Sequence, residues 1–378
     1  RDAQESRGLG DVYKRQGFGT NFRITTWGET HGAGVGVVVD GCPAGLPLER
    51  EDVQKYLDRR KPGQSKYTTQ RKEGDQVEIL SGIFEGRTTG TPISMVVYNK
   101  DQRSKDYSNI KDIYRPGHAD FTFDMKYGFR DYRGGGRSSG RETIGRVAAG
   151  AVAAKVLKEL GIEIKAYAKA IAGIEVSKDH FDFAEMNNNP FNMPDKEAAK
   201  LVQEKADQMI KEMDSIGGII ECQITGMPVG IGETVFDKLD AELSKAIMSI
   251  GSVKGFEIGD GFEAANLRGS ENNDDFICVD GKVEKETNHS GGVLGGMSDG
   301  SAIVFRAAIK PTPSIAQTQK TVNRDLDNVE IEIHGRHDPM IVPRAVVVVE
   351  SMAAVTILDG VLKNLGATMD NIKKIYGE

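Results

Sequence analysis

A glycine- and arginine-rich segment is the clearest candidate for ligand-binding chemistry in this sequence of 378 residues. The segment RGGGRSSGRET spans 133–143 and precedes a run of small apolar residues that predicts a helix. The first turn of a helix offers unpaired backbone N–H groups and the positive end of the helix dipole. With Arg137 and Arg141 beside them, these groups favour an anion-binding site. The alternative is a helix cap with a flexible loop, which alone would explain Ser139.

Two of the six histidines lie in turn-rich polar sequence, where catalytic side chains are common. His31 belongs to GETHG, directly after a predicted strand, and His118 belongs to YRPGHAD, close to Arg115 and Asp120. An imidazole titrates near neutral pH, so both side chains are suited to proton transfer. A hydrogen-bonded structural histidine explains each of them equally well when it is taken alone.

Two further segments combine basic side chains with polar groups. The cluster DRRKPGQSK at 58–66 suits phosphate, although cations at the end of a helix also complement its dipole. The segment IHGRHDP at 333–339 adds Arg336 and Asp338, and an aspartate before proline also suits a turn. Its His-x-x-His spacing lies outside an H-E-x-x-H motif, so we expect no metal site. Together, the segments predict chemistry on a small, multiply anionic, phosphorylated substrate.

The composition is that of a globular enzyme rather than a binder of nucleic acid or membranes. Lys and Arg number 49 against 56 Asp and Glu, and the resulting net charge of −7 opposes bulk binding to nucleic acid or an anionic membrane. No stretch approaches the roughly 18 consecutive apolar residues of a membrane span. Three widely spaced cysteines without a CxxC motif indicate a reducing, cytoplasmic compartment. The 45 glycines gather in short motifs, which favours a ligand-binding enzyme.

Common nucleotide-binding motifs are missing from the sequence. Gly135 and Gly140 have the spacing of a P-loop, but Arg141 and Glu142 follow where Lys and Ser or Thr are needed. No GxGxxG follows a predicted strand and opens a helix, so a dinucleotide-binding Rossmann fold is unsupported.

Helices and strands alternate irregularly around these motifs. Helices are predicted at about 50–60, 140–160, 196–215, 238–250 and 350–365. Ser139 and Glu142 predict a capping box for the second helix, and Asp237 an N-cap for the fourth. Strands are predicted at 23–27, 35–39, 77–80, 92–97, 218–224, 302–309 and 329–334. Without a βαβ rhythm or a linker, we expect one large α/β or α+β domain over 17–378, with 1–16 as a disordered or non-native tail.

Taken as a set, the motifs resemble the signatures of the chorismate synthase family. The family's three signatures are matched by GETHG at 28–32, RPGHAD with RGGGRSSGRET at 115–120 and 133–143, and GRHDP at 335–339. The likeness continues in order through RRKPGQSKYTTQR at 59–71, VKGFEIGDGF at 253–262, NHSGGVLGGMSDG at 288–300 and KPTPS at 310–314. It covers essentially 17–378.

The resemblance implies a lyase of the shikimate pathway, on the way to the aromatic amino acids. Such enzymes convert 5-enolpyruvylshikimate 3-phosphate to chorismate and phosphate by an anti-1,4-elimination. They need reduced FMN without net redox change, because the flavin is thought to lend an electron to the allylic phosphate and recover it. The implied fold is an α+β, single-domain β-α-β sandwich, with antiparallel sheets around central helices, assembled as a homotetramer. The reduced flavin is expected to come from outside, with NADPH as an indirect reductant.

The resemblance also assigns roles to individual residues. His31 would protonate or neutralise the departing phosphate, His118 would stabilise the anionic reduced flavin, and Asp338 would assist removal of the ring proton through the flavin N5 region. The expected substrate-binding cations are Arg60, Lys66, Arg115, Arg141 and Arg336. The expected FMN contacts are Arg137, Ser138, Ser139, Gly251, Ser252, Gly295, Lys310, Pro311, Thr312, Pro313, Ser314 and Arg336.

Four positions depart from the family pattern, and two other functions compete with this one. Lys66 lies where the family usually has Arg, and Met340 lies where Cys is common. Asp299 lies where a small or amide residue is usual, and Thr30 lies where Ser is frequent. A kinase-like transferase is one alternative, but the sequence lacks a P-loop and a clear Mg²⁺ carboxylate cluster. The other is an RNA-binding module using the basic segments 59–71 and 130–146, which the net charge opposes.

Overall fold

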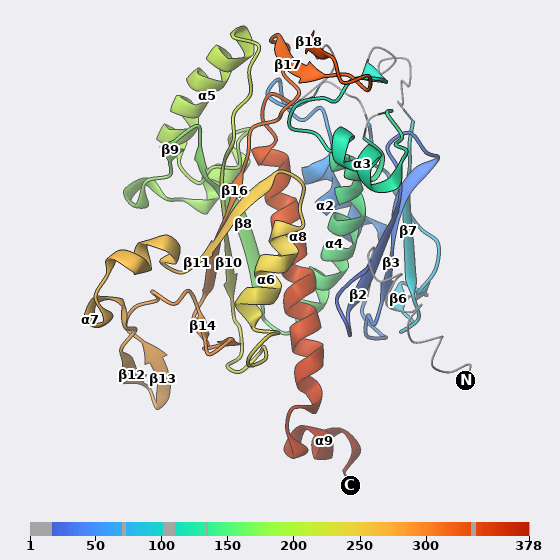
Figure 1. Ribbon diagram of the computed structural model, residues 1–378. Coiled ribbons are helices and arrows are strands. Elements are labelled where there is room, and N and C mark those ends of the chain that lie inside the picture. The colour runs from blue at the N-terminus through green and yellow to red at the C-terminus, as the bar shows by residue number, and fades with distance from the viewer. Residues whose placement is uncertain (1–16, 70–72, 101–109, 134, 334–337, 378) are drawn as a thin grey trace.

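Two five-stranded antiparallel sheets enclose a layer of helices in the computed structural model of the protein (Figure 1). The structure describes residues 17–69, 73–100, 110–133, 135–333 and 338–377. The first sheet has the order β1 (Gly17–Phe18), β2 (Arg23–Gly28), β3 (Gly34–Asp40), β7 (Ile93–Tyr98), β4 (Val77–Ile79). The second has the order β11 (Val253–Ile258), β16 (Ile303–Ile309), β10 (Gly218–Thr225), β8 (Glu163–Ile171), β9 (Ile174–Glu175).

Alternating burial along the strands turns one face of each sheet toward the helices. In β16, Ile303, Phe305, Ala307 and Ile309 are buried, and the residues between them are more exposed. Period-two alternation of this kind is what a sheet with one covered face requires. The antiparallel register places Cys222 of β10 opposite Phe305, so both contribute to one continuous core.

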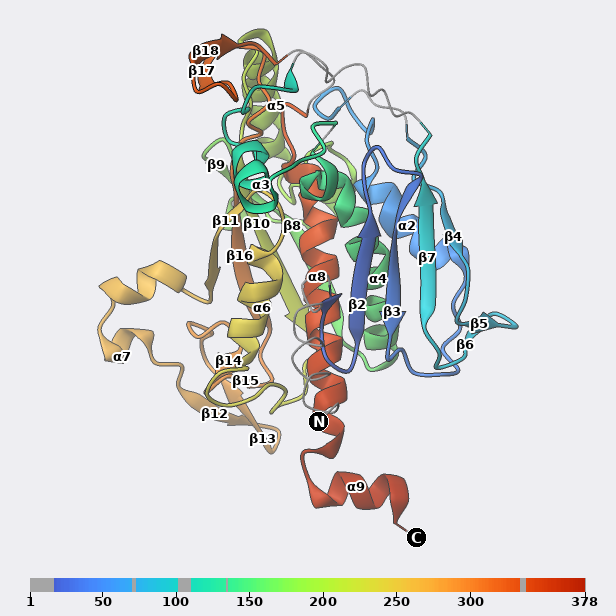
Figure 2. The same ribbon diagram turned by 45° about the vertical axis from the view of Figure 1, so that its right-hand side comes forward.

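Two long apolar helices, α4 (Thr143–Glu159) and α8 (Val342–Lys363), fill the space between the sheets (Figure 2). The helices cross where Gly150 of α4 meets Ser351 of α8. A Cβ at Gly150 would lie 2.2 Å from the Cβ of Ser351, so the close approach requires glycine. The small residues of α4 therefore allow the middle layer to be thin enough for both sheets to contact it.

Shorter helices and an anchored N-terminal segment complete the sandwich. Helix α2 (Arg50–Arg60) packs on α4 and α8, and α6 (Leu239–Met248) packs on α8 and β11. One carboxylate oxygen of Asp359 accepts hydrogen bonds from three backbone N–H groups, those of residues 20, 21 and 22, at 3.0, 2.6 and 2.9 Å. This contact ties the start of the first sheet to the far end of α8.

The remaining elements lie around the sandwich (Figure 1). The peripheral helices are α3 (Asp120–Tyr127), α5 (Lys196–Lys211), α7 (Gly269–Asn272) and α9 (Met369–Tyr376). The two-stranded hairpins are β5–β6 (Ile83–Phe84, Arg87–Thr88), β12–β13 (Phe276–Val279, Lys282–Lys285), β14–β15 (Val293–Leu294, Met297–Ser298) and β17–β18 (Gln319–Val322, Asn328–Ile331). The elements that bear on the site are therefore those of the sandwich and its connecting loops.

The expected α+β arrangement of antiparallel sheets around central helices is confirmed, with errors at particular elements. The helix predicted from 350 begins at Val342, because burial between two sheets outweighs the weak helix propensity of the valine run. Strand β8 was not predicted at all, since its sequence EIKAYAKAI has alanines where a strand usually has β-branched residues. The predicted N-cap at Asp237 is wrong, since α6 begins one residue later, after Lys238.

Helix α8 also bears on the expectation that no segment could span a membrane. The region Val342–Gly366 is long and apolar enough to cross one by length and composition, with a mean hydropathy of 2.0. However, 78% of its most apolar window is buried inside the protein. A helix covered by sheets on both sides needs the same composition as a membrane span, so its apolar sequence is explained by the core.

Candidate functional site

A cleft of about 860 Å³ opens where the ends of the central helices meet the loops of both sheets. Its lining comes from the ends of α2, α4 and α8, from the end of β2, and from the loops after α6 and β16. This volume lies within the ~300–1,000 Å³ range typical of small-molecule sites. The cleft therefore has room for a ligand held by several elements at once.

The described lining is strongly cationic. Its basic side chains are Arg60, Arg115, Arg137, Arg141, Arg146, Lys254, Lys310 and Arg344. Three carboxylates, those of Glu73, Glu142 and Asp338, also line it. In a chain with a net charge of −7, this excess of positive charge is local, and it favours a multiply anionic ligand.

The glycine- and arginine-rich segment folds as two tight turns before α4. The turns are 3-10 helices over Gly136–Ser138 and Gly140–Glu142. The hydroxyl of Ser139 accepts from the backbone N–H of Arg141 at 3.3 Å, as a cap would. The predicted capping box is wrong, because the Glu142 carboxylate instead accepts from Arg146 at 3.0 Å. The serine side chains thus face the cleft from turns rather than from the first turn of an α-helix.

Arg137 is oriented by the end of β2. Its guanidinium donates to the carbonyl of Gly28 at 2.9 Å and to the hydroxyl of Thr26 at 2.7 Å. Gly28 has φ +85°, and a Cβ there would lie 2.2 Å from the carbonyl oxygen of Gly34. His31 follows in the turn between β2 and β3 and lines the same cleft. Glycine at 28 therefore permits the sharp turn that carries His31 into the site.

His118 lies in the cleft as a neutral imidazole. Its Nδ1 is 2.9 Å from the carbonyl oxygen of Pro116, and its Nε2 is 2.9 Å from the hydroxyl of Ser314. Because a carbonyl can only accept, Nδ1 carries the proton. Burial, followed by the positive charge of Arg115, lowers the pKa of His118 from 6.5 to about 4. His118 was expected to stabilise the anionic reduced flavin. It can do so with a positive charge only if a bound anion raises this pKa.

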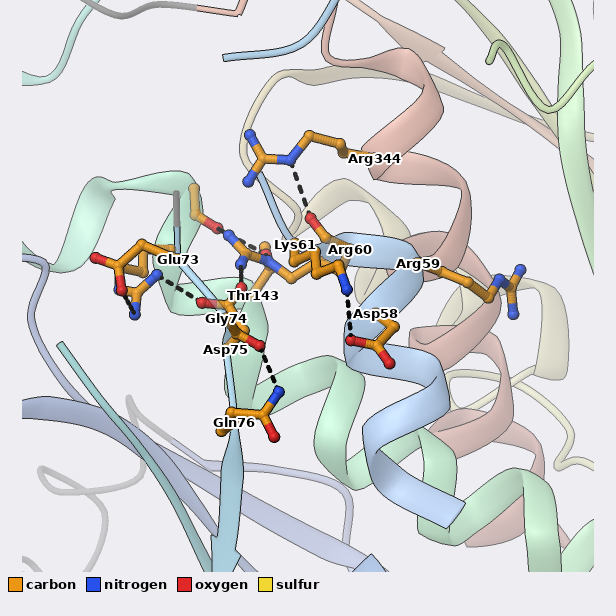
Figure 3. Close-up of polar contacts among 12 residues, drawn as sticks. Asp58, Arg59, Arg60, Lys61, Glu73, Gly74, Asp75, Gln76, Thr143 and Arg344 are labelled. Carbon is orange, nitrogen blue, oxygen red and sulfur yellow. Dashed lines mark hydrogen bonds and ion pairs between the residues drawn. The ribbon is translucent and has the colours of Figure 1, made fainter. Parts of the chain in front are cut away.

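Asp338 is held by groups from two other segments. One carboxylate oxygen accepts from the backbone N–H of Thr69 at 2.7 Å, and the other accepts from Nη1 of Arg344 at 2.6 Å. Arg344 also donates from Nε to the carbonyl of Arg60 at 3.0 Å (Figure 3). Arg344 thus joins the start of α8 to the end of α2 and to the loop that carries Asp338.

Arg60 and Arg141 meet at one buried carboxylate. Nη1 of Arg60 lies 2.6 Å from one oxygen of Asp75, and Nη1 of Arg141 lies 2.9 Å from the other. Arg60 also donates to Thr143 at 3.0 Å, and the close-up shows it between Thr143 and the loop of Asp75 (Figure 3). Burial lowers the pKa of Arg60 to about 10, so its guanidinium remains charged at neutral pH.

Arg115 is paired with a carboxylate behind the cleft. Its Nε and Nη2 donate to the two oxygens of Asp120 at 2.8 and 2.9 Å, a bidentate contact. Burial raises the pKa of Asp120, but the hydrogen bonds and charge of Arg115 outweigh it and the net shift is downward. Arg115 is therefore a fixed cation whose charge is partly balanced by its own partner.

Most of the predicted site residues that the structure describes line this cleft, and three do not. The lining includes His31, His118, Asp338, Arg60, Arg115, Arg137, Ser138, Ser139, Arg141, Gly251, Ser252, Lys310, Thr312, Pro313 and Ser314. Lys66 instead lies 2.8 Å from Asp207 with 63% of its side chain exposed, and Gly295 lies in the turn of the β14–β15 hairpin. Pro311 is absent from the described lining. Arg336 and both histidines of the His-x-x-His pattern lie outside the described residues.

Several charged groups at or beside the cleft were not predicted as site residues, and three of them take part in its ion pairs. Asp75, Arg344 and Arg146 are single charged residues in segments that were assigned other roles or none. Asp75 follows the basic cluster in the run RKEGD, and Arg344 lies in a stretch that was not predicted to be helical. Only the charge of Asp75 close to a basic cluster could have indicated that it pairs with an arginine.

Buried polar atoms in the lining fit a polar cofactor such as FMN. Among the described residues, the hydroxyls of Thr30 and Thr312 and Nη2 of Arg141 are buried without a hydrogen-bond partner. Such orphan groups are rare in folded proteins and need an acceptor or donor from a ligand or water. Within the described residues, no group of His, Cys, Asp and Glu is arranged to hold a metal ion. The lining therefore suits a phosphorylated, hydroxyl-bearing group of the FMN kind.

Comparisons with known proteins agree on one family. The family model for chorismate synthase matches residues 22–362. A chorismate synthase of Lachnospira eligens is 67% identical over 359 residues, covering 95% of this chain and 98% of the relative. One of Methanococcoides burtonii is 57% identical over 350 residues, covering 92% and 96%. A crystal structure described as chorismate synthase superposes with a TM-score of 0.75 at 31% identity, covering 94% of this chain and 96% of that one.

The family match at 22–362 includes all of the described cleft lining except Gly17 and Phe18 of β1. The chain therefore belongs to the chorismate synthase family and is an enzyme, a carbon–oxygen lyase.

Proposed function

We propose that the cleft catalyses the anti-1,4-elimination of phosphate from 5-enolpyruvylshikimate 3-phosphate, giving chorismate. The observation that carries this proposal is the gathering of eight lysines and arginines with His31, His118 and Asp338 around one cleft, in a chain of this family. The substrate bears one phosphate and two carboxylates, so it needs several cations at once. Arginine is suited to both kinds of group through bidentate hydrogen bonds.

Reduced FMN is the proposed cofactor. Arg137, Ser138 and Ser139 in the turns before α4 would hold it together with Ser252 after α6 and Lys310 after β16. When bound, it supplies an electron that is lent to the allylic phosphate and then recovered, so there is no net redox change. The orphan hydroxyls and the cationic lining support this proposal.

The protein's own side chains would bind the substrate and handle its proton and phosphate. In the 1,4-elimination, a ring proton leaves and the electrons of its C–H bond form a new double bond. The existing ring double bond shifts toward the carbon that bears the phosphate, and the C–O bond breaks with its electron pair leaving on the phosphate. His31 would donate to the departing phosphate, and Asp338, held by Thr69 and Arg344, would assist removal of the ring proton. The neutral His118, which carries its proton on Nδ1, would accept a hydrogen bond at Nε2, where the Ser314 hydroxyl lies 2.9 Å away.

The setting of the reaction is part of the same proposal. We place the enzyme in the cytoplasm, as a homotetramer that acts on a small molecule rather than on nucleic acid or a membrane. Its reduced flavin would come from an external supply, with NADPH as an indirect reductant.

An anaerobic assay tests the reaction and the cofactor together. Purified protein is mixed with 5-enolpyruvylshikimate 3-phosphate and chemically reduced FMN, and chorismate and phosphate are followed in the same samples. We expect equal amounts of both products with reduced FMN and none with oxidised FMN or without flavin. Phosphate release without chorismate, or turnover that does not depend on reduced flavin, would contradict the proposal. ATP-dependent phosphoryl transfer would favour the kinase-like alternative.

A further inference from the structure

The pairing of Arg60 and Arg141 at Asp75 joins two separate parts of the chain. Arg60 ends helix α2, and Arg141 lies in the turn before α4. Asp75 belongs to neither element, since it precedes strand β4. Its carboxylate gives one oxygen to each guanidinium, at 2.6 and 2.9 Å. The two arginines therefore share one carboxylate, and each has a neutral partner of its own: Thr143 accepts from Arg60 at 3.0 Å and Asn99 from Arg141 at 2.6 Å.

Burial makes this anchor necessary. The side chain of Asp75 is fully buried, and those of Arg60 and Arg141 are 4% and 9% exposed. Two guanidinium groups out of water would repel each other, and a buried charge without a partner is very costly. A carboxylate between them lets both stay charged at the wall of the cleft. Removing it would disturb both cations together.

The backbone around Asp75 is itself fixed. Its φ is +42°, a left-handed conformation that non-glycine residues rarely adopt. The side-chain amide of Gln54 brackets it, donating to the Asp75 carbonyl at 3.2 Å and accepting from the Val77 N–H at 3.0 Å. Through Gln54, helix α2 thus positions the Asp75 carboxylate, which in turn binds Arg60 at the end of the same helix.

One guanidinium nitrogen of this arginine pair remains available as a hydrogen-bond donor to a ligand. Nη2 of Arg141 is buried and has no hydrogen-bond partner among the described residues, and the carboxylate of Glu73 lies 3.6 Å from it. That separation is within ion-pair range but too long for a hydrogen bond. Both arginines line the cleft, so this orphan group lies where an anionic ligand would supply the missing acceptor.

We propose that Asp75 is a positioning residue that sets Arg60 and Arg141 as one anion-binding unit, so that affinity for an anionic group of the substrate depends on a carboxylate that does not touch it. The inference rests on the proposed function for its substrate, but the coupling between the arginines can be measured with inorganic phosphate alone. If Asp75 acted only as a negative charge, removing it would strengthen anion binding. If it acts by positioning, removing it weakens anion binding, because the donors no longer converge.

Asp75→Asn in the full chain tests the sign directly, with Asp299→Asn as the matched control. Asp299 is also buried in an ion pair, 2.7 Å from Lys285 with its side chain 6% exposed, and it does not line the cleft. Both variants should lose thermal stability. Only Asp75→Asn should weaken phosphate binding in calorimetry and raise KM for the proposed substrate. Each change should be about tenfold or more, because that is the effect of losing one charge-assisted hydrogen bond.

A double-mutant cycle keeps the inference testable if Asp75→Asn does not fold. Arg60→Lys and Arg141→Lys keep both charges but lose the planar fork. If the arginines act as one unit, the double variant should lose about as much phosphate affinity as the single variant with the larger loss. Independent sites would instead give losses that add. Additive losses, phosphate binding by Asp75→Asn as tight as in the parent, or a parent that binds no phosphate would each overturn the inference. A parent that binds phosphate without turnover would instead contradict the proposed function alone.

Discussion

His118 offers the sharpest test of the electrostatics of the cleft, because its pKa is expected to lie far from the ordinary value. Burial and the nearby charge of Arg115 lower that pKa from 6.5 to about 4, with Lys310 adding to the shift and Asp120 opposing it. At 1.36 kcal/mol per pKa unit, protonating His118 in the folded protein costs about 3 kcal/mol more than in the unfolded chain. The imidazole should therefore stay neutral across the physiological range.

The sign of the pH dependence follows from this shift. Between pH 6.5 and about 4 the unfolded chain binds a proton at this position and the folded protein does not. Stability must then fall as the pH is lowered through this window, and the loss levels off below pH 4. His118→Gln removes the titrating group, so the parent should lose up to about 3 kcal/mol more than the variant between pH 7 and pH 4.

NMR titration of the His118 imidazole, assigned by its absence from His118→Gln, measures the pKa directly. We expect a value near 4 in the ligand-free protein. An anion about 4 Å away is worth about 4 kcal/mol at an effective dielectric of 20, or about three pKa units, so saturating reduced FMN with its anionic ring at about that distance should raise the pKa markedly. A pKa of His118 at or above 6.5 without ligand would refute the reasoning. An equal loss of stability by the parent and by His118→Gln between pH 7 and pH 4 would refute it too.

Three further predictions concern stability. Gly150→Ala should lower the free energy of unfolding by about 3 kcal/mol, seen as a lower Tm, because the new Cβ would lie 2.2 Å from the Cβ of Ser351. Glu350→Gln should cost about 1–2 kcal/mol in urea denaturation, since it weakens the bidentate contact with Arg59, whose side chain is 42% exposed. Asp359→Asn should speed hydrogen exchange at the three backbone amides bound by that carboxylate, and an unchanged rate would contradict its role as an anchor.

Much of the candidate site could be predicted because its residues lie in short motifs rich in glycine and charge. Gly28 at the end of β2 and Gly135 and Gly136 before α4 have positive φ, and His31 and Arg137 lie within three residues of these glycines. The local sequence was therefore sufficient to predict His31 and Arg137 as site residues without knowledge of the fold.

The rest of the site depends on contacts between distant segments. Asp75 reaches Arg141 across 66 positions of the chain, and Arg344 reaches Arg60 across 284. No local pattern carries such a pairing. The early start of α8 was missed for a related reason, since its valine run becomes helical only when two sheets bury it. Because this helix start was not predicted, Arg344 was not predicted as a site residue either. Its position at the start of α8 is what brings it to Asp338.

A crystal structure of the protein with bound 5-enolpyruvylshikimate 3-phosphate and oxidised FMN tests the central claim most directly. That claim is that one cleft holds both molecules. We predict density for both inside it, with an anionic group of the substrate within hydrogen-bond distance of Arg141 and the flavin beside Arg137 and Ser139. Ordered ligands bound elsewhere, with the arginine pair still contacting only protein groups, would contradict it.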